Sequence, residues 1–158
     1  MSRDAQSRGR LLPGRPGFFV ALAAALIAGC SNGEAPRDVV ELESGEVQLP
    51  AGARRHDIRL EGVGAEGEVD PASVDAAPGD AVAFIAGDGI THSVMFLADR
   101  MDGSQVAFLD STSQRRGPPL LSEGSTWVVS LVAAPPGDYA FACALHGGAG
   151  TVRVAARD

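Results

Sequence analysis

The chain has 158 residues, with 20 acidic side chains, 13 arginines and no lysine, and its net charge is −7 at pH 7. This surplus of negative charge argues against binding to nucleic acid, whose phosphates attract basic side chains. The length is sufficient for one domain with a core of its own.

The first 29 residues are predicted to be a signal peptide. Arginines precede the apolar run 18–27 and small residues follow it, which is the order of a secretory leader. Ile27-Ala28-Gly29-Cys30 also resembles a bacterial lipobox, in which the cysteine is lipidated and becomes the mature N-terminus. The alternatives are an ordinary signal peptide or a short membrane helix, but the run is much shorter than the ~20 residues that span a bilayer. We therefore expect a lipoprotein of the bacterial cell envelope, anchored through Cys30 and facing the periplasm or the exterior.

The next segment, residues 30–54, contains serine, glycine and proline and is predicted to be a flexible tether, with a brief strand possible near residues 46–49. Loss of residues 1–29 removes four arginines and one acid, which leaves nine basic and 19 acidic side chains and a net charge of −10. Such a chain favours a partner with a positively charged docking face.

Residues 55–158 show the pattern of a β-rich domain. Strands are predicted near residues 58–60 and over 81–85, 91–97, 126–132 and 139–143. Gly87-Asp88-Gly89 predicts a hairpin between the second and third of these. Residues 99–124 lack a strand pattern, which allows a functional loop or a short helix at 105–110. Short strands with frequent turns and no sustained helical period indicate an all-β sandwich.

A candidate metal site lies at the end of the strand predicted over residues 139–143. Tyr139, Phe141 and Cys143 share one face of it, so the strand ends with a thiol on its bulky face. His146 follows three residues later in a glycine-rich turn, and His92 is a candidate from the middle of the chain. A soft thiolate and two imidazoles are the donors of a Cys-His-His metal site.

Each of these residues also has a structural interpretation. A buried cysteine often packs as a small apolar residue, and a lone histidine often only satisfies a hydrogen bond. Lipidation of Cys30 would leave Cys143 unpaired in an oxidising compartment, which is a liability unless the thiol is buried or bound to metal. A Cys30–Cys143 disulfide is the competing account. The remaining histidine, His56, is interpreted as a solvated residue at a strand edge.

Three blocks of the sequence resemble the cupredoxins, the blue-copper family of plastocyanin, amicyanin and pseudoazurin. They are residues 77–84, residues 89–96 around His92, and residues 136–146. The resemblance implies an all-β, cupredoxin-like Greek-key β-sandwich over residues 55–158. It also implies one copper ion, cycling between Cu(I) and Cu(II), with His92, Cys143 and His146 as its ligands. The implied function is a one-electron carrier that serves a redox partner protein in the envelope, and not an enzyme. A copper-delivery module and a metal-free interaction domain are the alternatives.

The axial methionine of the family has no counterpart here. Plastocyanin-like loops carry it a few residues beyond the last histidine, where this chain has only residues 147–151, Gly-Gly-Ala-Gly-Thr. Met95 is expected on the opposite strand face from His92, while Met101, in the irregular segment, stays a candidate. The identity of the axial ligand is therefore left open, and we expect a site that azide or imidazole can enter.

Overall fold

The computed structural model describes residues 39–42, 45–63 and 66–156, all within one compact unit, Glu34–Asp158. The predicted signal peptide and the predicted lipidation site at Cys30 lie outside the described residues. In chain order the elements are β1 (Val39–Leu42), β2 (Gly45–Gln48), β3 (Arg55–Val63), β4 (Glu66–Asp70), β5 (Ser73–Ala76), β6 (Ala81–Ala86), β7 (Val94–Phe96), the 3-10 helix η1 (Ala98–Arg100), α1 (Gly103–Ser111), β8 (Thr126–Ser130), β9 (Gly137–Cys143) and β10 (Ala149–Val154).

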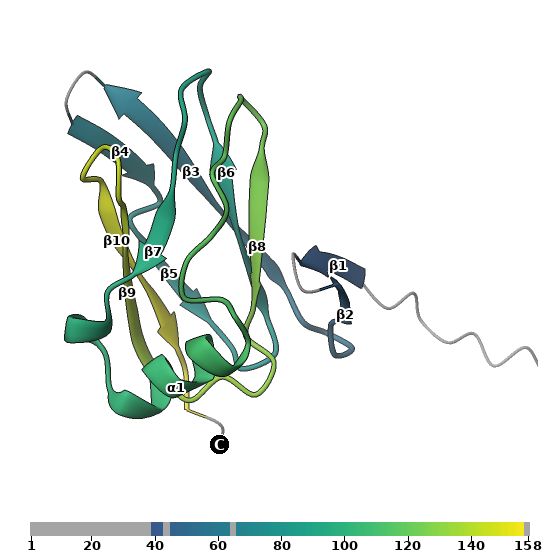
Figure 1. Cartoon of the computed structure of the whole chain (residues 1–158). Helices are drawn as coiled ribbons and strands as arrows, with labels where there is room; N and C mark the ends of the chain where they lie inside the picture. Colours follow the sequence, from purple (N-terminus) through teal and green to yellow (C-terminus); the bar gives the residue numbers. More distant parts are fainter. Residues whose placement is uncertain (1–38, 43–44, 64–65, 157–158) are drawn as a thin grey trace, which may run out of the picture. The chain divides into compact units, whose positions relative to one another are not determined.

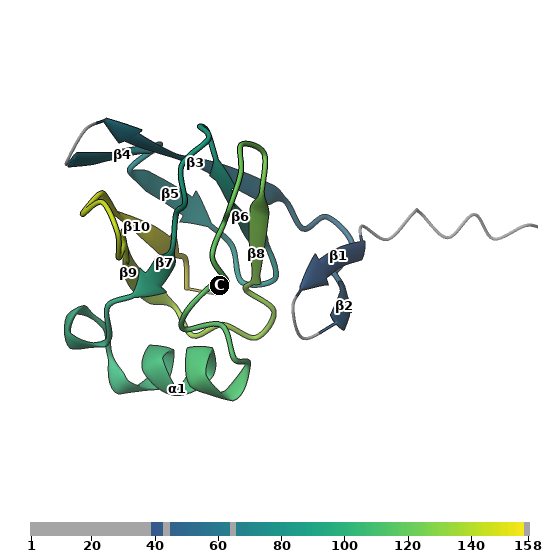
Figure 2. The ribbon, with the colours of Figure 1, turned by 45° about the horizontal axis from the view of Figure 1, so that its top comes forward.

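Two four-stranded sheets form the body of the domain, in the orders β5-β10-β9-β7 and β4-β3-β6-β8. The pairs β3–β6 and β5–β10 are parallel, and the remaining pairs in these sheets are antiparallel. The sheets face each other as two layers, and α1 crosses one end of the sandwich (Figures 1 and 2). The all-β sandwich expected from the sequence is confirmed. The loops β6–β7 and β9–β10 lie at the end opposite α1 (Figure 1).

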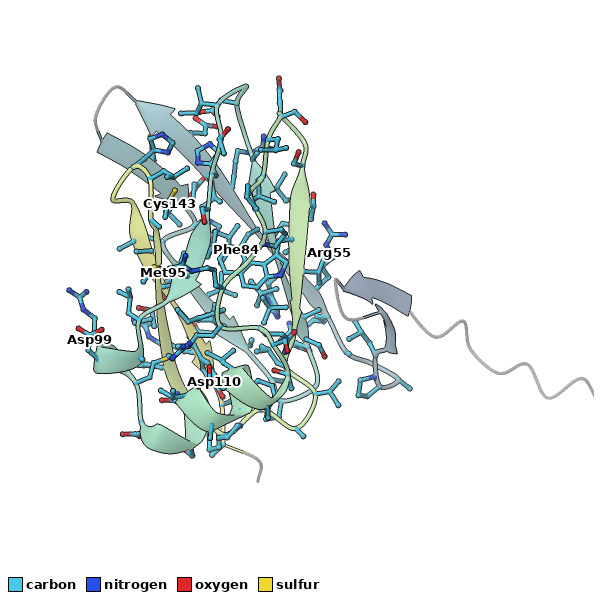
Figure 3. All side chains as sticks on the ribbon, viewed as in Figure 1. Arg55, Phe84, Met95, Asp99, Asp110 and Cys143 are labelled. Atoms are coloured by element: carbon cyan, nitrogen blue, oxygen red, sulfur yellow. The ribbon has the colours of Figure 1, made fainter. Side chains whose placement is uncertain are left out.

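The core between the sheets is rich in aromatic rings. On β9, Tyr139, Phe141 and Cys143 are buried and alternate with more exposed neighbours, as predicted. Phe84 of β6 faces them, and its ring centroid lies 4.9 Å from that of Phe141 and 5.4 Å from that of Trp127 (Figure 3). Full burial of an aromatic side chain of this kind contributes roughly 1.5–3 kcal/mol. The packing therefore holds β9, with the thiol at its end, firmly against the opposite sheet.

The start of β9 is anchored as well. The Tyr139 hydroxyl donates a hydrogen bond to the Pro135 carbonyl at 2.8 Å, and burial raises the pKa of Tyr139 to about 12. Gly137 has a φ of +133° and lies so close to α1 that a Cβ there would come within 2.6 Å of Gln105 Nε2. Only glycine accepts both this φ and this approach. Of the loop or short helix that the sequence allowed at 105–110, the structure has the helix, as the slightly longer α1, and it packs against the end of β9 remote from the thiol.

The hairpin predicted across Gly87-Asp88-Gly89 is wrong. β6 pairs with β3 and β8, whereas β7 pairs with β9, so residues 87–93 carry the chain from one sheet to the other. Both edges of β6 are occupied and nearly all of its side chains are buried, so long-range packing and not the local turn determines its partners. The strand predicted over 91–97 is also shorter, because β7 covers only Val94–Phe96.

His56 is less solvated than the sequence suggested. β4 pairs only with Arg59–Val63, so His56 has a strand partner on the β6 side alone, yet its side chain is only 17% exposed. Its Nε2 lies 2.8 Å from Oδ2 of Asp80, a buried carboxylate that also accepts hydrogen bonds from the backbone N–H groups of Arg54 and Ala77. His56 is therefore part of a polar cluster that ties the start of β3 to the turn before β6.

Part of the segment predicted as a tether is folded. β1 and β2 pair as an antiparallel hairpin, which includes most of the strand expected near residues 46–49. Leu49 is 3% exposed and packs with Ala81 and Ala83 of β6 and Val128 of β8. Packed structure thus begins before residue 55. Within the described part of the chain, no helix has the length and apolar character needed to cross a bilayer.

Candidate metal centre

His92 is held by its backbone just before β7. Its N–H donates to the Leu120 carbonyl at 2.9 Å, and the Leu120 N–H donates back at 2.8 Å. This isolated bridge with Leu120 fixes the backbone of the residue, and only 1% of its surface is exposed. The segment 112–124, which showed no strand pattern in the sequence, therefore supplies Leu120 as the backbone partner that holds the candidate ligand His92 in place.

Cys143 and His146 are set by the tight turn between β9 and β10. The Cys143 N–H donates to the Gly148 carbonyl at 2.7 Å, and the Gly147 N–H donates to the Cys143 carbonyl at 3.0 Å. Gly147 has a φ of +76°, which glycine adopts without strain. The turn brings the side chain of His146 back over the thiol.

The three predicted residues converge on one point. Sγ of Cys143 lies 3.8 Å from Nδ1 of His92 and 3.7 Å from Nδ1 of His146. One donor atom from each of the three residues lies within 4.8 Å of the others. The two imidazole rings have their centroids 5.2 Å apart at an interplanar angle of 66°. His56 is not part of this group, in agreement with its exclusion at the level of sequence.

Sequence reasoning missed one contact of the site, the carboxylate of Asp88. Its Oδ1 lies 2.8 Å from Nε2 of His92, four residues along the chain. Its Oδ2 accepts a 2.6 Å hydrogen bond from the Gly62 N–H, and Oδ1 also accepts one from the Ile90 N–H at 3.2 Å. The N–H of Gly62 and the ring of His92 lower the pKa of Asp88 to about 2. The only signal in the sequence was the spacing of four residues between Asp88 and His92, which was overlooked because Asp88 was assigned to a hairpin turn.

A glycine of β4 supports the turn that carries His146. The Gly67 N–H donates a 2.6 Å hydrogen bond to the His146 carbonyl. A Cβ at Gly67 would come within 2.9 Å of the His146 Cβ, so a larger residue would displace the turn. Gly67 thus provides a close backbone approach to the site, and a single sequence does not distinguish this use of glycine from an interruption of a strand.

The thiol of Cys143 is readily ionised. Burial by itself would raise the pKa of Cys143, but the hydrogen bonds with the backbone at Ser93 and Leu145 and the contact with the ring of His92 outweigh it and lower the pKa to about 6. For His92, burial by itself would lower the pKa, and the Asp88 carboxylate and Cys143 together raise it. A thiolate is the form of cysteine that binds metal.

Neither remaining methionine is placed to serve as an axial ligand. Met95 lies on the outer face of β7, as strand parity predicted, and its sulfur is 3.7 Å from Nη2 of Arg116 (Figure 3). Met101 lines a surface pocket together with Gly137, which is at the opposite end of β9 from Cys143. The structure thus removes Met101 from the candidates that the sequence left open.

The donor set fits a copper ion. A thiolate suits Cu(I), imidazoles suit both oxidation states, and a set of one sulfur and two nitrogens is characteristic of a mononuclear electron-transfer copper site. A sandwich of two sheets with a cysteine and two histidines gathered at one end defines the class of single-copper β-sandwich proteins. The chain belongs to the copper-binding proteins of the plastocyanin/azurin family, whose sequence model matches residues 58–155. Its fold is the cupredoxin-like Greek-key sandwich and its cofactor is a single copper ion.

Solved structures similar to this one include both small copper proteins and an enzyme. A purple cupredoxin from Nitrosopumilus maritimus is 17% identical, with 63% of this chain and 99% of that chain covered and a TM-score of 0.47. A pseudoazurin from Methylobacterium extorquens is 21% identical, with 65% and 76% covered and a TM-score of 0.44. A copper-containing nitrite reductase from Thermus scotoductus is 17% identical, with 77% and 26% covered and a TM-score of 0.48. No match was found among curated protein sequences.

Proposed function

We propose that this protein is a one-electron carrier of the bacterial envelope and not an enzyme. The observation that supports this most is the convergence of Cys143, His92 and His146 within 4.8 Å in a chain of a copper-binding family. These three residues would hold the ion, and copper bound there supplies one-electron chemistry between its +1 and +2 states.

The way the three side chains are held suits that function. His92 is fixed by its two hydrogen bonds with Leu120, and Cys143 by its hydrogen bond to Gly148 and by the core packing of β9. Donors held by a packed framework keep one geometry whatever the charge of the bound group. Burial of His92 and Cys143 also excludes water from two of the three donors.

His146 would be the route by which electrons enter and leave. It is more exposed than His92 and Cys143. Ile90 and Leu145, which lie near the two histidines in the chain, are 39% and 56% exposed, and Leu121, next to the residue that bridges His92, is 69% exposed. Apolar side chains that gather around a site favour docking there. We infer that Ile90, Leu121 and Leu145 form an apolar docking surface around His146, and that the redox partner meets it with positively charged groups because the chain is acidic.

The carrier assignment predicts a reversible one-electron wave when the copper-loaded protein is studied by voltammetry. Fast self-exchange between the oxidised and reduced forms should broaden the NMR signals of residues near His146. A copper-delivery module would instead transfer its copper rapidly to an acceptor chelator and show slow electron exchange. A protein that takes up no copper, or one that turns over nitrite at a substantial rate, would contradict the proposal.

The anchor is proposed from the sequence around Cys30, and it predicts where the protein is found. Cys30→Ser should block lipidation and leave a larger precursor that is not processed, because the modified cysteine defines the new N-terminus in the lipobox pathway. Cell fractionation and mass spectrometry of the N-terminus measure both effects. Normal cleavage and release of that variant as a soluble product would show that the leader is an ordinary signal peptide.

A further inference from the structure

The Asp88 carboxylate occupies a position from which it controls His92. It lies in the segment that crosses from β6 to β7, and 28% of its side chain is exposed. Three groups converge on it: the Gly62 N–H at 2.6 Å, the Ile90 N–H at 3.2 Å and Nε2 of His92 at 2.8 Å. A Cβ at Gly62, near the end of β3, would meet the end of the Ile90 side chain, which would have to shift to make room.

The first two contacts determine the direction of the third. A backbone N–H can only donate, so the carboxylate accepts from Gly62 and Ile90 and is held as an anion. An ionised carboxylate has no proton to offer, so Nε2 of His92 must carry the proton and donate it. When the ring is neutral, Nδ1, which lies 3.8 Å from Sγ of Cys143, is then the nitrogen with a free lone pair. The hydrogen bond thus favours the Nε2–H tautomer, in which Nδ1 is free to bind a metal ion beside Cys143.

We propose, on the basis of the copper site described above, that Asp88 is a positioning residue that fixes the tautomer of His92 and stabilises Cu(II) relative to Cu(I). A carboxylate bonded to the far nitrogen of a ligating imidazole orients the ring and makes it a stronger donor. Its fixed negative charge, one imidazole away from the ion, stabilises the more positive oxidation state. Asp88 therefore holds the reduction potential below the value that the three donors alone would give.

The test uses Asp88→Asn in the full-length protein. Asparagine keeps a carbonyl that can accept from Nε2 but removes the charge. The matched control is Asp138→Asn, which removes the same charge from an exposed residue near the other end of β9. We expect Asp88→Asn to weaken Cu(II) binding by about 10- to 100-fold, with a smaller change for Cu(I) and a higher reduction potential. Asp138→Asn should leave both affinities and the potential close to wild type.

A second measurement needs no copper, and its first part uses the wild-type protein. The ¹⁵N chemical shifts of the histidine rings in the metal-free protein should show His92 with its proton on Nε2. Asp88→Ala should convert it to a mixture of tautomers or to the Nδ1–H form. If Asp88→Asn fails to fold, the tautomer of His92 in the wild-type protein still tests whether Asp88 holds the ring proton on Nε2.

The outcomes separate this proposal from the proposed function. An absent thiolate-to-copper absorption band in the wild-type protein would overturn the electron-carrier assignment, whatever the tautomer of His92. A normal band, with a potential in Asp88→Asn that matches Asp138→Asn, would overturn the role of Asp88 alone. A neutral His92 whose only ring proton is on Nδ1 in the metal-free wild type would overturn it as well.

Discussion

Cys143→Ser is expected to abolish the visible absorption of the copper-loaded protein completely. The intense band of such a site is charge transfer from thiolate sulfur to Cu(II), and Cys143 supplies the sulfur of the His92–Cys143–His146 cluster. A serine hydroxyl does not ionise near neutral pH and is a hard donor, so it replaces neither the charge nor the softness of the thiolate. Copper titration followed by absorption spectroscopy measures the effect.

Histidine variants provide the control for the ligand assignment. His92→Ala should weaken or shift the band, because one of the two imidazole donors is lost. His56→Ala is the matched control, since it removes an imidazole that contacts Asp80 and lies outside the metal cluster. The assignment is wrong if His56→Ala removes the colour while His92→Ala keeps it.

Asp80→Ala is expected to lower the free energy of unfolding by about 3 kcal/mol. The carboxylate is 3% exposed and accepts hydrogen bonds from two backbone N–H groups as well as contacting His56. Removing it leaves those partly buried donors without their acceptor, at a cost of roughly 1–3 kcal/mol for each donor that water does not reach. Denaturant unfolding of the metal-free protein measures the difference. Asp57→Ala, at an exposed carboxylate paired with Arg55, should change it by less than about 1 kcal/mol.

Asp80 is also expected to make the free energy of unfolding depend on pH. Burial by itself would raise the pKa of Asp80, but the N–H groups of Ala77 and Arg54, with His56, outweigh it and lower the pKa. A carboxyl whose pKa is lower in the folded state stabilises the fold above its unfolded pKa, and this stability is lost as the pH falls through the folded pKa. Asp80→Ala should therefore lose less stability on acidification than the wild type. Parallel curves for the two proteins between neutral pH and pH 2 would contradict this.

The features that the sequence predicted well are those encoded locally. Alternation along Tyr139, Phe141 and Cys143 placed the thiol on the buried face of β9, because side chains of a strand alternate whatever its partners are. The spacing of Cys143 and His146 matched a tight glycine turn, so two candidate ligands were certain to lie close together. The three blocks that resemble the cupredoxins added His92, and the structure places it with them.

What the sequence did not predict depends on contacts between distant segments. The turn residues around Asp88 favour a hairpin locally, but β6 is already paired on both edges, and the segment crosses between sheets instead. The Asp88–Gly62 and Asp80–Arg54 hydrogen bonds each join residues 26 positions apart. No periodicity or turn signal reports such pairs. The support of the His146 turn by Gly67 is equally non-local.

The separation of the candidate ligands along the chain also bears on when copper can be acquired. Cys143 and His146 are three residues apart and stay neighbours in any conformation, whereas His92 is 51 residues from Cys143. An unfolded chain would therefore bind copper through two donors, Cys143 and His146. The third donor, His92, joins them only after a long loop has closed, at an entropic cost. Copper stabilises the native protein only by the ratio of its affinities for the folded and unfolded chains. Because His92 adds its donor only in the folded chain, it raises this ratio, and copper then stabilises the folded protein more than it stabilises the unfolded polypeptide.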